Sequence, residues 1–289
     1  MHLHHKTRGS GLILLGAVLW GTTGTAQALA PESASSLAIG AVRITIGGLV
    51  LLLQAFFRGA FRQRSSWPKL PTFLAAVSMA AYQPCFFAGV SKTGVAIGTV
   101  VAIGSSPVLT GILGILFFKE RPGWKWLFAT VLAVWGCVLL FTATNQVSIN
   151  ISGIIMALCA GLAYASYVLF SKQVLEQHPP EAVTAVIFCI GTVILSPLLF
   201  TQKLTWLLVP EGLAAALHLG IITTAVAYSL FSRGLTIIPV ANAVTLTLAE
   251  PLTAAILGVT LLGEQLTRPA FWGIALLFAG LAIVSLEKR

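Results

Sequence analysis

Three ionisable residues stand inside long apolar runs of the sequence, where a charge is costly. They are Arg43, His218 and Glu250. On insertion scales an ionisable side chain near the middle of a bilayer costs about 2.5–3.5 kcal/mol, so such a residue is a candidate for function. At a helical rise of about 1.5 Å per residue, Arg43 and Glu250 are expected at similar depths, close enough to attract one another.

The chemistry of these charges points to a zwitterion site or to a proton carrier. A guanidinium binds a carboxylate through two parallel hydrogen bonds, and Glu250 can receive a substrate ammonium or a proton. The same two charges can equally fasten two helices together without any role in transport, and the sequence leaves both interpretations open. For His218 a proton path is one interpretation, but a hydrogen bond to a neighbouring helix is the favoured one.

Aromatic and small polar side chains accompany the charges. All four tyrosines fall well inside the apolar runs, whereas tyrosine is usually enriched at membrane interfaces. A phenol facing lipid would leave its hydroxyl unpaired, so these groups are expected either in helix contacts or around a wet cavity. We predict an aromatic-walled cavity. Its candidate residues are Trp20, Thr22, Thr23, Gln27, Tyr82, Gln83, Ser105, Ser106, Tyr164, Tyr167, Tyr228, Thr245 and Thr247.

Glycine and proline residues occur within the same apolar runs. A proline within a helix removes one backbone hydrogen bond, and in a membrane the freed carbonyl needs a partner in the protein or in a wet cavity. We predict helix breaks or gating points at Gly21, Gly24, Pro84, Pro107 and Pro251.

The composition places all of these residues in a membrane protein. Of the 289 residues, 57% are hydrophobic and 9% are charged, and the mean hydropathy is +0.95; a soluble domain has about 25% charged residues. All eight acidic residues are Glu, which excludes mechanisms that need an aspartate. The sequence lacks the zinc-protease, nucleophile-elbow and phosphate-binding-loop motifs. The four cysteines have no metal-ligand spacing, so we expect no enzyme, cofactor or metal.

The elements that must position the charged residues are membrane-spanning helices. About 20 apolar residues cross a hydrocarbon core of about 30 Å. Runs of this length predict an all-α protein with ten spans, at residues 11–30, 36–57, 71–91, 94–118, 124–143, 151–170, 182–200, 211–231, 238–262 and 269–286.

The connections between these spans carry a strong charge bias. Thirteen of the seventeen Lys and Arg residues fall on the side of both termini, three fall on the opposite side, and Arg43 lies within a span. Positively charged loops remain in the cytoplasm, so both termini are predicted to be cytoplasmic. The net charge of +9 is thereby explained by membrane flanks, and no nucleic-acid partner is expected.

The chain also matches itself at an offset of 144 residues. Pro107 and Glu120 recur as Pro251 and Glu264, each pair enclosing a Leu-Gly step. Two halves of five helices follow, and because five is odd the second half enters the membrane from the opposite face. Inverted repeats around a mid-membrane cavity are typical of alternating access, in which the site opens to one side and then to the other.

With these features the chain resembles the EamA family of the drug/metabolite transporter superfamily. The likeness covers nearly the whole chain. It depends on Trp20-Gly21, on Arg43, on the segment from Ser106-Pro107 to Glu120, and on its second copy from Glu250-Pro251 to Gly263-Glu264. The resemblance implies export of small metabolites, commonly amino acids or amphipathic toxicants, from a bacterial inner membrane, with aromatic amino-acid exporters as the nearest functional relatives.

We therefore expect a secondary transporter that exports small amphipathic metabolites such as amino acids, driven by protons or by the solute gradient. The alternatives are a carrier of cationic drugs and a solute channel. We expect it to act as a monomer in the lipid bilayer. We expect a cytoplasmic tail at residues 1–10, a first five-helix repeat at 11–143 and a periplasmic linker at 144–150. A second five-helix repeat is expected at 151–286 and a cytoplasmic C-terminus at 287–289.

Overall fold

The computed structural model describes residues 2–62, 66–93, 95–119, 122–141, 150–262 and 268–286. Every regular element in these ranges is helical, which confirms the predicted all-α class. The elements are α1 (His2–Gly21), α2 (Thr23–Ala28), α3 (Ser36–Phe57), α4 (Lys69–Thr93), α5 (Val95–Phe118), α6 (Trp124–Phe141), α7 (Ile151–Leu175), α8 (Pro180–Thr201), η1 (Thr205–Leu208), α9 (Pro210–Leu217), η2 (His218–Val226), α10 (Ala227–Leu235), α11 (Val240–Leu246), α12 (Ala249–Leu262) and α13 (Arg268–Ser285).

Nine helical segments of the described chain are long and apolar enough to cross a membrane. The segment at the predicted fifth span is shorter, from Trp124 to Leu139, so its crossing remains a prediction. The first helix begins at His2 instead of residue 11. The predicted C-terminus 287–289, most of the predicted linker 144–150, and the repeat residues Glu120 and Glu264 lie outside the described residues.

Local sequence explains where several helices begin. The Ser35 hydroxyl accepts a hydrogen bond from the backbone N–H of Ala38 at 3.2 Å, and the Asn150 side chain accepts one from that of Gly153 at 3.1 Å. Both are N-caps, which satisfy backbone donors that the helix itself leaves free. Pro180 and Pro210 open α8 and α9, where proline's fixed φ and missing N–H carry no penalty.

Two of the predicted spans are broken near mid-length. The first changes from α1 to α2 at Thr22, directly after Gly21, and the ninth changes from α11 to α12 just before Ala249, so that Pro251 lies in the first turn of α12. The predicted breaks at Pro84 and Pro107 are wrong, because α4 and α5 continue through both prolines. A single proline removes only one hydrogen bond, and surrounding helices can hold the rest of the helix in place.

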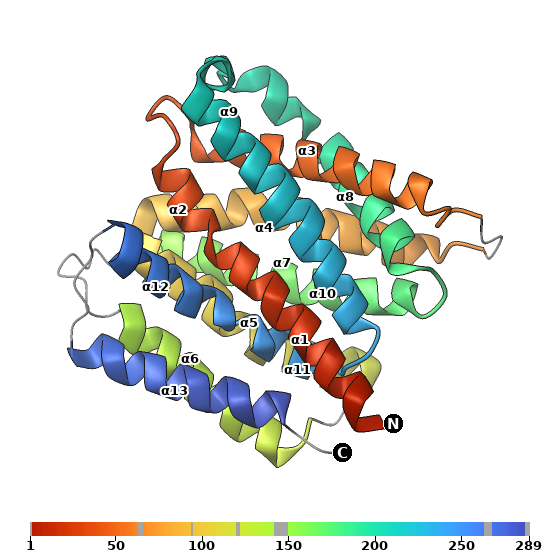
Figure 1. The fold of residues 1–289 in the computed structure, drawn as a ribbon, viewed down its shortest axis with the longest axis vertical. Helices are drawn as coiled ribbons and strands as arrows, with labels where there is room; N and C mark the ends of the chain where they lie inside the picture. Colours follow the sequence, from red (N-terminus) through yellow and green to blue (C-terminus); the bar gives the residue numbers. More distant parts are fainter. Residues whose placement is uncertain are drawn as a thin grey trace.

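The two halves of the chain pack against each other in reciprocal pairs. The first span contacts the eighth through α1 and α10, and the third contacts the sixth through α4 and α7. The second contacts the eighth through α3 and η2, and the seventh contacts the third through α8 and α4. Figure 1 shows the α6–α13 pair at one edge of the bundle and the α3–α8 pair at the opposite edge, with the start of α1 and the end of α13 at the same end.

Glycine allows α6 and α13 to approach closely. A Cβ atom added at Gly136 would lie 2.7 Å from both the carbonyl oxygen of Gly273 and the backbone nitrogen of Leu277. We expect Gly136→Ala to lower the midpoint of thermal unfolding in detergent by roughly 3–8 °C, since overpacked backbone contacts cost about 1–3 kcal/mol. The control is Gly11→Ala, where nothing lies within 4 Å; equal midpoints for the two variants would contradict the close contact.

Candidate functional site

A cavity of about 380 Å³ lies between the broken and the continuous helices. Its wall contains most of the predicted site residues: Trp20, Gly21, Thr23, Gly24, Gln27, Arg43, Tyr82, Gln83, Ser106, Tyr164, Tyr228, Thr247, Glu250 and Pro251. They come from both halves of the chain, so the two halves share this cavity.

The two helix breaks meet at this cavity. A Cβ atom at Gly21 would lie 2.5 Å from the Cβ of Thr253 and 2.7 Å from the carbonyl oxygen of Glu250. The end of α1 therefore rests directly on the first turn of α12, and only glycine fits there. Because Thr247 sits in the break itself and Glu250 in the first turn beyond it, both side chains reach the wall of the cavity.

Arg43 is held by close packing of α3 against the π-helix η2. A Cβ atom at Gly47 would lie 2.3 Å from a methyl carbon of Thr224, and one at Gly220 would lie 2.5 Å from Ile46. This proximity lets the Arg43 Nε donate a hydrogen bond to the Thr224 hydroxyl at 3.4 Å. The arginine is 7% exposed, so its charge is largely shielded from bulk water.

Arg43 and Glu250 line the same cavity without pairing with one another. Both ion pairs among the described residues involve Glu181, elsewhere in the bundle. One positive and one negative charge are therefore presented separately to the cavity. This arrangement can bind a molecule that carries both an anionic and a cationic group, since each buried charge gains an opposite partner.

Aromatic rings form the rest of the wall. The Trp20 ring centroid lies 4.7 Å from that of Tyr228 and 6.3 Å from that of Tyr164, and the centroid of Tyr82 lies 5.9 Å from that of Tyr164. The Trp20 Nε1, the Tyr164 hydroxyl and the Gln83 Oε1 have no hydrogen-bond partner among the described residues. Polar atoms of this kind usually find partners, yet these three are buried behind the open surface of the cavity.

Seven further cavity residues were missed from sequence, and three of them lie on one face of α4. The wall also contains Ala28, Phe86, Phe87, Val90, Thr99, Ile103 and Ala254. Positions 82, 83, 86, 87 and 90 share one face of a helix with a period of 3.6 residues. Continuing that face from Tyr82 and Gln83 would have found the two phenylalanines.

Three predicted wall residues instead lie in helix contacts. The Thr245 hydroxyl accepts a hydrogen bond from Trp126 Nε1 at 3.0 Å, and a Cβ atom added at Gly161 of α7 would lie 2.3 Å from the Ser105 hydroxyl oxygen. Tyr167 is 1% exposed and packs edge-on against the ring of Phe188. Each lies on a face of its helix turned toward a neighbour, which position along a span does not reveal.

Thr22 and His218 are also absent from the cavity wall, and they bond with each other. The Thr22 Oγ1 lies 2.8 Å from the His218 Nε2 and also donates to the carbonyl of Leu19 at 2.7 Å. The histidine therefore fastens the break between α1 and α2 to η2. This agrees with a structural hydrogen bond, the favoured interpretation of His218 from sequence.

We expect His218→Gln to retain solute transport within about twofold of the parent at every pH between 6 and 8, because an amide can keep a hydrogen bond to Thr22. The measurement is solute uptake by reconstituted vesicles across that pH range. A loss of pH dependence in this variant would instead assign His218 to a proton path.

A membrane bundle with a charged, aromatic-walled cavity at its centre has the construction of a solute transporter. The chain belongs to the EamA-like transporter family, whose model matches residues 7–142 and 151–286. The family resemblance found in the sequence is thereby confirmed, and the chain is a multi-pass membrane transporter of this type.

Individual relatives agree with this assignment. The chain is 48% identical to the uncharacterized transporter YwfM of Bacillus subtilis, over 96% of this chain and 93% of that protein. It is 31% identical to the threonine/homoserine exporter RhtA of Escherichia coli K12, over 78% of this chain and 74% of that one. A solved crystal structure with 21% identity superposes with a TM-score of 0.82 and covers 95% of each chain, which supports the fold.

Proposed function

We propose that this protein is a secondary carrier that exports small zwitterionic amino acids by alternating access. The observation that carries the proposal is the pair of separate opposite charges, Arg43 and Glu250, in one aromatic-walled cavity. Arg43 binds the substrate carboxylate, Glu250 binds its ammonium, and the rings contact its side chain.

The charges of the wall also define the expected substrate class. Among the described wall residues Arg43 is the cation and Glu250 the anion, so a neutral zwitterion leaves neither unpaired. An acidic or a basic side chain would add a charge without a partner, which is costly in a buried site. The same argument disfavours cationic drugs, since Arg43 repels them.

The relatives support export and the amino-acid class. RhtA is named as an exporter of threonine and homoserine, both of which are neutral zwitterions. A cavity of about 380 Å³ lies near the lower end of the range for ligand pockets, about 300–1,000 Å³, as expected for a small solute.

Reciprocal packing supports an inverted repeat as the basis of alternating access. If each span of the first half is replaced by its counterpart in the second half and the reverse, the α1–α10 contact becomes the α4–α7 contact. In the same way the α3–η2 contact becomes the α8–α4 contact. Two halves of five crossings each would make these contacts pseudo-symmetric, and two conformations of similar energy follow from such an arrangement. We propose the repeats as residues 11–143 and 151–286.

The Lys and Arg bias supports both termini in the cytoplasm of a bacterial cell, with the carrier in the inner membrane. The driving species is either the proton or the solute gradient itself, and we propose a monomer as the transporting unit. The start of α1 and the end of α13 lie at one end of the bundle (Figure 1), in agreement with this orientation.

Counterflow tests the proposed function. Purified protein is reconstituted in vesicles loaded with unlabelled threonine or phenylalanine, and labelled amino acid is added outside with and without a pH gradient. Exchange of neutral amino acids is expected, with glutamate, lysine and the cation ethidium slower by about tenfold or more. Equal exchange of ethidium would favour the drug carrier, and flux that is not stimulated by internal solute would favour a channel.

A further inference from the structure

The cavity extends toward the end of the bundle that lies away from the chain termini. Ala28 ends α2, Val90 lies near the end of α4, and Thr99 lies near the start of α5, and all three line the cavity. Toward the other end, Trp20 packs at a tilt against the buried ring of Phe231, and Tyr228 packs edge-on against the buried ring of Phe188. The structure therefore represents a state closed at the end that carries the termini.

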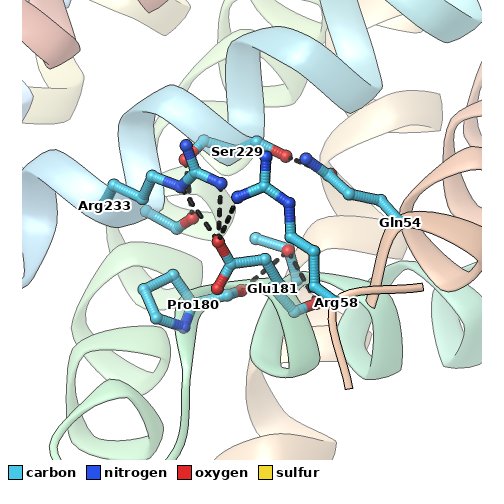
Figure 2. Close-up of polar contacts among 8 residues, drawn as sticks. Gln54, Arg58, Pro180, Glu181, Ser229 and Arg233 are labelled. Atoms are coloured by element: carbon cyan, nitrogen blue, oxygen red, sulfur yellow. Dashed lines mark hydrogen bonds and ion pairs between the residues drawn. The ribbon is translucent and has the colours of Figure 1, made fainter. Parts of the chain in front are cut away.

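A charged cluster joins three spans at this closed end (Figure 2). Glu181, in the first turn of α8, accepts hydrogen bonds through its Oε1 from Arg233 of α10 at 2.6 and 3.1 Å, and from Arg58 after α3 at 3.2 Å. Beside them, the Ser229 hydroxyl donates to the side-chain oxygen of Gln54 at 2.8 Å.

The exposed fractions of the three side chains bear on how strongly the cluster can hold the spans together. The Glu181 side chain is 15% exposed, against 30% for Arg233 and 53% for Arg58. An isolated surface ion pair contributes little to stability, but a carboxylate shared by two guanidiniums in a partly buried place contributes more. Because the three residues belong to the second, seventh and eighth spans, the cluster resists separation of these spans.

The opposite end of the bundle has no such cluster at the equivalent positions. Shifted by the repeat offset of 144 residues, Arg58 corresponds to Gln202, Glu181 to Leu37 and Arg233 to Gly89. The contact at Gln202 is a neutral hydrogen bond, donated by the Ser35 hydroxyl at 2.7 Å. At these three pairs of equivalent positions the charges therefore stand at one end alone, which a role in folding common to both halves would not explain.

We propose that Arg58, Glu181 and Arg233 form a latch that holds the terminal end of the bundle closed, so that the resting carrier opens its cavity to the opposite side. The inference rests on the proposed alternating access. Each opening toward the termini separates Glu181 from at least one arginine, and closing re-forms the bonds. The latch sets the balance between two conformations and touches no substrate.

The test measures cysteine labelling by N-ethylmaleimide in a background in which the four native cysteines are replaced by serine. Ser171→Cys reports on the closed end, where Ser171 is buried at 3% exposure. Thr99→Cys reports on the cavity mouth. In the Glu181→Gln variant we expect labelling of Ser171→Cys to rise about three- to tenfold and labelling of Thr99→Cys to fall. Opposite changes of this kind indicate a shift from the state closed at the terminal end to the state open there.

The matched control is Glu211→Gln. Glu211 follows a helix-opening proline just as Glu181 does, but it is exposed and lies outside both described ion pairs. Labelling in this variant is expected to equal that of the parent. Should Glu181→Gln not fold, Arg58→Gln removes the most exposed partner and should shift both reporters in the same directions by a smaller factor.

Unchanged labelling at both positions, or a rise at both, would overturn the latch, because a rise at both indicates general loosening. Counterflow by the parent is measured separately. Its absence contradicts the proposed function, whereas intact counterflow with unchanged labelling contradicts the latch alone.

Discussion

Replacing Arg43 by glutamine is expected to reduce neutral amino-acid exchange by about a hundredfold, since losing one partner of a buried charged contact costs about 2–5 kcal/mol and each 1.4 kcal/mol is tenfold. Glutamine can still reach Thr224, which now accepts from the Arg43 Nε, so the local packing is largely retained. The measurement is the initial rate of counterflow in vesicles with equal amounts of inserted protein.

Arg43→Lys separates charge from shape. A lysine keeps the positive charge but cannot form two parallel hydrogen bonds to a carboxylate, so partial exchange, between that of Arg43→Gln and that of the parent, is expected. Full exchange by Arg43→Gln would contradict the assignment of Arg43 to the substrate carboxylate. The thermal midpoint of each variant shows whether any loss is one of folding.

Glu250→Gln is expected to reduce amino-acid exchange about as much as Arg43→Gln does, because the buried ammonium of the substrate would face a neutral amide. Glutamine has nearly the same volume as glutamate, so the contact of Gly21 with the carbonyl oxygen of Glu250 is preserved. Counterflow and accumulation driven by a pH gradient are measured in parallel. Both are expected to fall by about a hundredfold.

The parallel measurement distinguishes the two roles that sequence left open for Glu250. Counterflow moves substrate in both directions without net proton movement, so a residue that serves only as proton carrier is dispensable for it. Intact counterflow with lost gradient-driven accumulation would therefore reassign Glu250 to the proton. Thr247→Val, at a neighbouring wall position, is the control for a local change in packing.

The sequence alone determined that this protein lies in a lipid bilayer and which segments form its helices. Long apolar runs predict membrane helices because every backbone polar group in lipid must be satisfied within the helix. Arg43 and Glu250 were identified for the same reason, since charges in lipid are retained where they have a use. Both proved to line the cavity, together with Trp20, Tyr82 and Tyr228.

Only the tertiary structure decided which face of each helix turns inward. Thr23 lines the cavity while its neighbour Thr22 bonds to His218, 196 positions along the chain. The helices α4 and α5 likewise continue through Pro84 and Pro107, although proline in the sequence predicts a break at each. The cluster of Arg58, Glu181 and Arg233 joins three spans, and its members have no pattern in sequence because their attraction depends on distance in space, not along the chain.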